Sequence, residues 1–328
     1  MRNKFYRVCK IIVSSLMILI VFFGLRFLFV PVMYGHWAEH DKKKNRDCID
    51  VVILGDSFAV NSIQPSEINE IYNCVSYNAG TSAQTNDMMF YTLKDLHKSI
   101  KIKKAILCLD CYNFKPSDVA SNFSSYVIAM ERINNPLIKI ECLLNTVGEK
   151  NIIDFIMPDF YFNERNLKEI PSNVKVKTSR DYRNYAIDKT KETYYLDMGY
   201  VYTSISSPDS DSATRIDLNT LSVDEINWLT KTLDYCFENN IEVILLQTPF
   251  KRSAFSKIKG YENYNNKIKD IATEYGVDFY DFNRYVEYGE IQDEMYKDET
   301  HVNYEGSCIL MKWIKRAVSS DDPKSLFD

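Results

Sequence analysis

The sequence predicts an α/β fold: a doubly wound parallel five-stranded sheet flanked by helices and preceded by one N-terminal transmembrane helix. Short, mostly apolar segments alternate with longer amphipathic ones, as expected where strands are buried on both faces and covered by helices. A separate apolar stretch near the N-terminus is long enough to cross a bilayer. The chain has 328 residues, of which 45% are apolar and 26% charged, so it can bury a sizeable core.

Five segments have the length and composition of buried parallel strands. They are residues 49–54, 74–77, 104–109, 241–246 and 277–280. In sheets of this kind, ligands and catalytic groups collect at the carboxyl ends of the strands. The loops that follow Leu54, Tyr77, Leu109 and Leu246 are therefore where a site is expected.

Helix signals separate these strands. Pro65 suits the first turn of a helix, Ser222 and Glu225 form a capping box, and Gly276 is a typical C-cap. The expected helices are 65–72, 85–96, one that begins after 222, 264–275 and 303–318. Residues 120–220 are helical at first and then rich in Tyr, Asn and Lys without a clear period. This pattern indicates an insertion that packs over the sheet rather than a separate domain.

The N-terminal stretch, residues 11–33, is apolar except for two serines and Arg26. Basic residues precede it, and by the positive-inside rule they keep the N-terminus in the cytoplasm. Basic residues after position 41 weaken this prediction of orientation. A cleaved signal peptide would need small residues at the cut, and 27–33 supply none. A buried core helix would be amphipathic or capped, and this stretch is neither.

The sequence thus predicts a single-pass protein of the cytoplasmic membrane with an extracytoplasmic domain. The expected parts are a cytoplasmic basic tail at 1–10, the transmembrane anchor at 11–33, a linker at 34–47, and the α/β domain at 48–328 with its insertion at about 120–220.

The net charge and the spacing of His and Cys residues argue against several classes of function. The formal net charge of −5 gives no attraction to phosphate backbones, so nucleic acid is not expected as a partner. The four histidines have no zinc-ligand spacing, and no metal or other cofactor is expected. Cys108 and Cys111 form a C-x-x-C, but without a second ligand pair they are interpreted as buried thiols.

The first predicted strand ends in Gly55-Asp56-Ser57, where Gly55 permits a tight turn that presents Ser57 at the strand's end. A serine hydroxyl is a poor nucleophile unless a base takes its proton. His301 lies in a polar loop before the last helix, and Asp298 precedes it by three residues. Asp298 can therefore fix the tautomer of the imidazole. These residues predict a catalytic set of Ser57, His301 and Asp298.

Acyl transfer also needs hydrogen-bond donors aimed at the developing oxyanion. The backbone N–H of Ser57 is one candidate. The second predicted strand runs into Asn78-Ala-Gly80, and the Gly80 N–H is another, since no side chain blocks its approach to a substrate.

These motifs, in this order, resemble the SGNH (GDSL-type) hydrolase pattern over roughly residues 49–114 and 240–318. The resemblance implies a sheet of the SGNH, flavodoxin-like kind. It also implies Ser57 as nucleophile, His301 as base, Asp298 as orienting acid and Gly80 as an oxyanion donor. The family's third block, usually Gly-x-Asn-Asp, is altered here to Asp110-Cys-Tyr-Asn113, and Asn113 is the nearest counterpart of its oxyanion Asn.

The predicted anchor and the stretch Ser62-Ile-Gln-Pro65 resemble an envelope-facing branch of that family. This branch includes the D-alanine-transfer protein of the teichoic-acid pathway and polysaccharide O-acetylation proteins. The resemblance implies acyl transfer or ester hydrolysis on an acylated surface glycan or polymer, with a membrane-bound acyl-transfer partner. Two other classes stay open: a non-catalytic glycan-binding or assembly factor, and a small-molecule binder that would need no Ser–His pair.

Overall fold

The computed structural model describes residues 2–115, 123–147, 164–179, 187–207 and 215–327. The chain forms two compact units. One contains residues 1–33 and 153–185, and the other contains residues 34–152 and 186–328. The larger unit holds the sheet and every candidate site residue.

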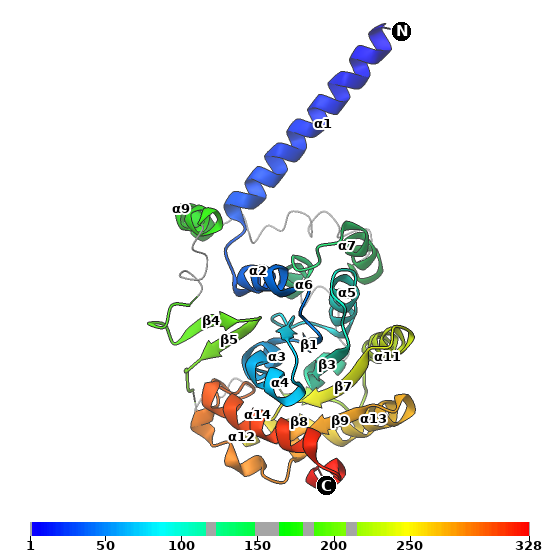
Figure 1. The fold of residues 1–328 in the computed structure, drawn as a ribbon, viewed down its shortest axis with the longest axis vertical. Coiled ribbons are helices and arrows are strands. Elements are labelled where there is room, and N and C mark those ends of the chain that lie inside the picture. The colour runs from blue at the N-terminus through cyan, green and yellow to red at the C-terminus, as the bar shows by residue number, and fades with distance from the viewer. Residues whose placement is uncertain (1, 116–122, 148–163, 180–186, 208–214, 328) are drawn as a thin grey trace. The chain divides into compact units, whose positions relative to one another are not determined.

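A five-stranded parallel sheet forms the centre of the larger unit, as predicted (Figure 1). Its strands, in spatial order, are β2 (Ser76–Asn78), β1 (Val51–Gly55), β3 (Lys104–Leu109), β7 (Glu242–Gln247) and β9 (Asp278–Asp281). Along the chain this is the order 2-1-3-4-5 of flavodoxin-like sheets. The order reverses between β1 and β3, which places a crevice beyond the carboxyl ends of these two strands.

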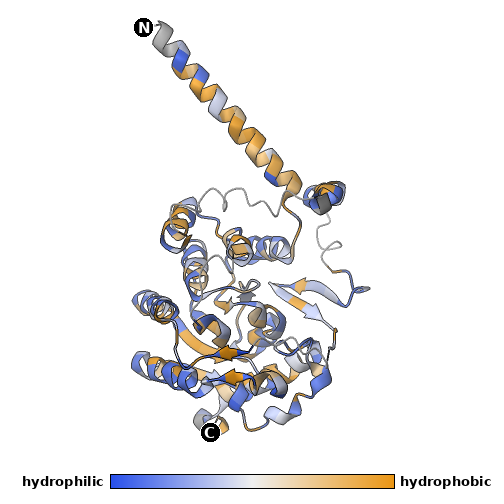
Figure 2. Ribbon diagram, turned by 180° about the vertical axis from the view of Figure 1, so that it is seen from behind, coloured by the Kyte–Doolittle hydropathy of each residue, from blue (hydrophilic) through white to orange (hydrophobic). Residues whose placement is uncertain are grey.

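Helices cover both faces of the sheet, because the strand side chains are apolar on both sides (Figures 1 and 2). On one face α5 packs against α11, and on the other α14 packs against α3 and α4. The helices are α3 (Ser57–Ser62), α4 (Pro65–Tyr72), α5 (Asn86–His97), α11 (Val223–Glu238), α13 (Tyr261–Tyr275) and α14 (Tyr304–Ser319).

The predicted helix boundaries have the expected local causes. Pro65 is the first residue of α4. The Ser222 side chain accepts a hydrogen bond from the Glu225 N–H at 3.3 Å, which caps the start of α11. Gly276 ends α13 with φ +64°, a left-handed conformation that glycine adopts without strain.

The described part of the predicted insertion contains helices and a small antiparallel hairpin. The elements are α6 (Phe123–Met130), α7 (Pro136–Cys142), β4 (Thr193–Asp197) and β5 (Tyr200–Thr203). The hairpin turns at Met198 and Gly199, both with positive φ. The insertion also supplies α9 (Glu164–Thr178), which belongs to the smaller unit. The predicted insertion is thus divided between the two units, and its residues 120–122, 148–163, 180–186 and 208–214 lie outside the described residues.

Residues 34–47, expected to be a linker, instead contain helix α2 (Tyr34–Asn45). Ala38, Asp41 and Lys42 are buried in it, so the helix is part of the larger unit. Its polar composition suggested a solvated segment. The structure differs because distant residues supply partners for its charged side chains.

The smaller unit contains α1 (Arg2–Phe29), which is apolar along most of its length (Figure 2). The segment Tyr6–Phe29 has a mean hydropathy of 2.6 and is long enough to span a membrane. The helix ends before the predicted limit at residue 33, because Pro31 disfavours helical backbone just before it. Signal sequences and core helices share such composition, so membrane insertion stays a prediction.

The end of α1 packs against α9 within the same unit. The Lys177 ammonium of α9 donates to the carbonyl oxygens of Phe27 and Val30, each at 2.5 Å. These are among the carbonyls that a helix C-terminus leaves without intrahelical partners. The two helices therefore stabilise each other at the base of α1.

Candidate active site

Ser57 is presented by a sharp turn at the carboxyl end of β1. Gly55 has φ +146°, and a Cβ there would lie 2.5 Å from the Cys108 carbonyl oxygen of β3, so only glycine fits. The Asp56 side chain then accepts a hydrogen bond from the Phe58 N–H at 2.9 Å and caps α3. Ser57 is consequently the first residue of α3, where backbone N–H groups have no intrahelical acceptor.

The structure brings His301 to Ser57 from the opposite end of the sequence. Ser57 Oγ lies 2.7 Å from His301 Nε2, within hydrogen-bond distance. On the other side of the ring, Nδ1 lies 2.9 and 3.0 Å from the two carboxylate oxygens of Asp298. The three side chains therefore lie in the order expected of a Ser–His–Asp triad.

The Asp298 carboxylate is held by donors within its own loop. Besides the imidazole, the backbone N–H groups of Thr300 and His301 each donate to Oδ1 at 2.9 Å. Burial alone would raise the pKa of Asp298, but the hydrogen bond and charge of His301, together with these backbone bonds, hold the pKa well below its usual range. Asp298 is thus an ionised acceptor beside the ring.

Aromatic side chains pack against and around the His301 imidazole. The Phe58 ring stacks on the His301 ring at 4.5 Å with an interplanar angle of 15°, and Phe250 meets Phe58 edge-on at 5.3 Å. Tyr112 packs against Phe250 in turn. The His301 side chain keeps 19% of its surface exposed, and Ser57 is half-buried. The imidazole is therefore oriented by packing, while both His301 and Ser57 remain partly accessible to solvent.

Both predicted oxyanion donors, Gly80 and Asn113, form hydrogen bonds within the neighbouring loops. The Gly80 N–H donates to Asn78 Oδ1 at 3.0 Å, and the Asn113 side-chain amide donates to the Gln84 carbonyl at 3.0 Å. An amide carries two N–H groups, so this bond does not use the whole donor capacity of Asn113. The roles of Gly80 and Asn113 as oxyanion donors stay predictions.

Sequence reasoning missed a buried pair of carboxyl groups next to Ser57. In the paired strands Gly55 lies opposite Cys108, so Asp56 and Asp110 leave the sheet at the same edge. Both are buried, with exposed fractions of 3% and 7%, and their side chains hydrogen-bond to each other. An acidic residue directly after each of two predicted strands was the signal that could have revealed them.

Two carboxyl groups that hydrogen-bond to each other cannot both ionise readily, because their negative charges would repel. Burial raises the pKa of Asp56 well above its usual range, and the adjacent Asp110 raises it further. Burial also raises the pKa of Asp110, although its hydrogen bonds from Asp56 and Tyr112 act in the opposite direction. Both carboxyls beside the Ser57 turn therefore hold a proton more readily than free carboxyls do.

The stretch 62–65 has a structural place behind the site. The Gln64 side-chain amide donates to Ser307 Oγ at 2.8 Å, and Ser307 Oγ donates to the Ser62 carbonyl at 2.8 Å. These bonds join the end of α3 to α14, which follows directly after His301. A cavity of about 450 Å³ lies elsewhere, at the amino ends of β3, β7 and β9, where Lys104, Glu242 and Asp278 line it.

No family model matches the chain. No curated protein matches it either.

Among solved structures, the chain is similar to a GDSL-like lipase from Bacteroides thetaiotaomicron, with 13% identity, a TM-score of 0.40, and coverage of 87% of this chain and 96% of that chain. A candidate acylhydrolase from Bacteroides fragilis has 11% identity, a TM-score of 0.39, and coverage of 90% and 99%. A candidate lipolytic protein of the G-D-S-L family from Desulfitobacterium hafniense has 12% identity, a TM-score of 0.38, and coverage of 81% and 98%. Likeness at this level does not establish a reaction, which must follow from the geometry of the chain's own residues.

Proposed function

We propose that the protein performs serine-dependent acyl transfer or ester hydrolysis through an acyl-Ser57 intermediate. The observation that carries this proposal is the 2.7 Å contact between Ser57 Oγ and His301 Nε2, with Asp298 on the far side of the ring. A binder or scaffold would need no such alignment.

The reaction has two halves. His301 Nε2 takes the Ser57 proton as Oγ bonds to the carbonyl carbon of an ester, and the departing alkoxide leaves with that proton. Water or a second hydroxyl then gives its proton to His301 and attacks the acyl carbon, and Ser57 Oγ departs and takes the proton back. Asp298 stabilises the imidazolium that forms in each half and keeps its Nδ1–H in place.

The substrate we propose is an acylated glycan or polymer of the cell envelope. The apolar helix α1 supports this choice, because an anchored enzyme outside the cytoplasmic membrane would meet such polymers. A membrane-bound acyl-transfer partner would supply or receive the acyl group if the enzyme is a transferase. With water as acceptor, the same site is an esterase.

Labelling by a fluorophosphonate tests the proposal on the full chain in detergent. We expect the wild type and Ser66→Ala, a control at an exposed serine of α4, to be labelled, and Ser57→Ala to be unlabelled. Hydrolysis of a simple acyl ester should follow the same pattern. Envelope acylation restored equally by wild type and Ser57→Ala in cells lacking the protein would instead favour a non-catalytic assembly factor.

A further inference from the structure

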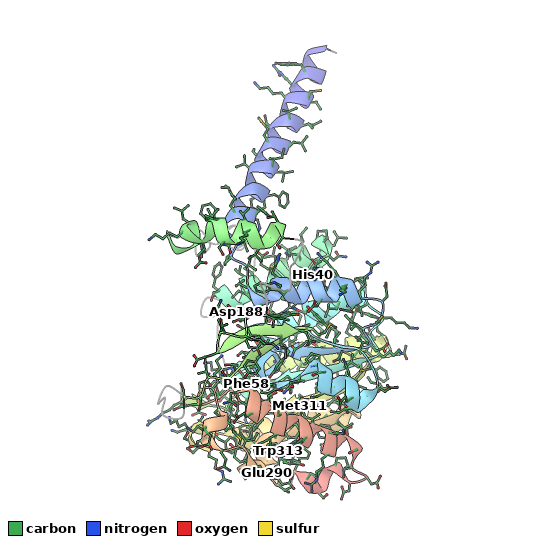
Figure 3. The ribbon with its side chains drawn as sticks, turned by 60° about the vertical axis from the view of Figure 1, so that its left-hand side comes forward. His40, Phe58, Asp188, Glu290, Met311 and Trp313 are labelled. Carbon is green, nitrogen blue, oxygen red and sulfur yellow. The ribbon has the colours of Figure 1, made fainter. Side chains whose placement is uncertain are left out.

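Helix α2 carries charged side chains that are turned into the larger unit. Asp41 and Lys42 have exposed fractions of 4% and 5%, although both belong to residue types that are rarely buried without partners. Trp37 of the same helix stacks on Tyr195 of β4 at 6.2 Å. Figure 3 shows α2, marked by His40, against the rest of this unit. Its contacts extend by two routes to the loop that follows β2.

The first route passes through Arg132, which is 92% buried in the turn after α6. Arg132 Nη1 donates to the Gly80 carbonyl at 2.8 Å, and Nη2 donates to the Tyr77 hydroxyl. Arg132 Nε lies 3.7 Å from a carboxylate oxygen of Glu39 in α2. The other Glu39 oxygen accepts from Lys42 at 2.6 Å, so the carboxylate is held in place.

The second route passes through Asp41 and the β4–β5 hairpin. Asp41 Oδ2 accepts hydrogen bonds from the Tyr195 hydroxyl at 2.6 Å and from the Met198 N–H at 3.1 Å. The Met198 carbonyl in turn accepts from the Asn78 N–H at 2.8 Å. This route reaches the same loop from its other side.

Both routes end on residues 77–80, and this segment holds the nucleophile helix. The Asn78 side-chain amide donates to the carbonyl of Ala59 in α3 at 2.7 Å and to that of Ile63, just after α3, at 3.1 Å. The Thr81 N–H donates to the Gly55 carbonyl at 3.1 Å, at the turn before Ser57. A displacement of this segment would therefore move the Ser57 turn.

We propose that Glu39, Asp41, Arg132 and Met198, here named the α2 clamp, position the loop after β2 and the nucleophile helix for the proposed acyl transfer. Arg132 and Asp41 are its positioning residues, and neither touches Ser57 or His301. The inference rests on the proposed function for its kinetic readout only, since the position of the loop can be measured without a reaction.

The test uses full-chain Arg132→Met, Arg132→Lys and Asp41→Asn, with Lys43→Gln as a control at an exposed residue of α2. Active-site titration with the fluorophosphonate counts competent molecules, and ester turnover per competent molecule gives kcat. We expect Arg132→Met to lower kcat roughly 10- to 100-fold with KM little changed, the effect of slight misplacement of a reacting group. Arg132→Lys should recover part of that loss, and Asp41→Asn should lower kcat less than Arg132→Met.

Hydrogen exchange at the amides of Asn78, Gly80 and Thr81 gives a second readout that needs no activity. We expect faster exchange there in Arg132→Met and Asp41→Asn, and wild-type exchange in Lys43→Gln. If Arg132→Met does not fold, the clamp is tested with Asp41→Asn, which keeps the shape of the side chain. Variants with wild-type kcat and wild-type exchange would overturn the clamp. A wild-type protein that is not labelled by the fluorophosphonate would overturn the proposed function instead. The hydrogen-exchange result would then still show whether the α2 clamp positions the loop after β2.

Discussion

Two loops at the carboxyl edge of the sheet are held in opposite ways. In the loop of Asp298 and His301 the catalytic-set carboxylate is held locally, because Asp298 binds the backbone and side chain of residues two and three positions later. Lys251 and Lys257 bind the intervening Glu299. The loop after β2 is fixed from far along the chain, by Arg132 and Met198. One carries the proposed base, and the other carries a proposed oxyanion donor, Gly80.

This difference teaches which parts of the site tolerate change elsewhere in the protein. A loop whose hydrogen bonds are local keeps its geometry when distant residues are altered. A loop whose hydrogen bonds come from the insertion depends on how the insertion packs, including its contacts with α2. We therefore expect substitutions in the first loop to affect chemistry directly, and distant substitutions to affect the second.

The largest effect is expected from the reacting pair. Ser57→Ala and His301→Ala should each lower kcat by about 10⁴- to 10⁶-fold, and the double variant should be little worse, because residues that act as a unit are not additive. Turnover of a chromogenic acyl ester measures this. Independent, multiplying losses would show that the two side chains do not work together.

Asp298→Asn tests the local loop and should cost roughly 10²- to 10⁴-fold in kcat, through loss of ring orientation and of charge. The pH dependence of stability has a definite sign. The folded-state pKa of Asp298 is lowered, so its contribution is present above the unfolded pKa of about 3.9 and is lost as pH falls toward the folded pKa. The Tm difference between wild type and Asp298→Asn should therefore be largest near neutrality and shrink below about pH 4. A difference that grows with acidity would contradict the ionised carboxylate.

Asn113→Ala sharpens the comparison at the altered third block. If its amide donates to the oxyanion, kcat should fall roughly 10²- to 10³-fold with little change in KM. We expect this result, measured on the same ester, with Asn145→Ala as a control for loss of a hydrogen-bonded asparagine amide outside the site. A change in melting temperature with wild-type kcat would limit Asn113 to its bond with the Gln84 carbonyl.

The smallest effect is expected from Asp110→Asn, and it concerns stability. The pKa of Asp56 is raised in the folded state, so its contribution to stability is present below the unfolded pKa and is lost as pH rises through the folded pKa. Removing the neighbouring charge of Asp110 should reduce that loss, because a like charge beside Asp56 raises its pKa. Urea unfolding of both proteins between pH 5 and pH 9 measures the difference. Parallel stability curves would mean that the charge of Asp110 does not raise the pKa of Asp56.

Much of the larger unit follows from local sequence patterns. The five strands and the boundaries near Pro65, Ser222 and Gly276 were predicted because periodicity, capping and turn preferences act over a few residues. The same holds for the hydrogen bonds of the Asp298 carboxylate, which reach residues two and three positions later. The helix at 34–45 was not predicted, because what buries it is not local. The partners of Glu39 and Asp41 lie about 90 to 160 positions away.

The sequence by itself determined the sheet, the Gly55 turn and the residue types that acyl chemistry needs. Only the tertiary structure decided that Ser57 meets His301 across 244 positions, that Asp56 lies against Asp110, and that Arg132 and Met198 bind the loop after β2. Local preferences are set by each residue and its near neighbours, whereas burial and pairing depend on which distant segments pack together. Packing of α/β layers around one sheet is what turned separate short motifs into one candidate site.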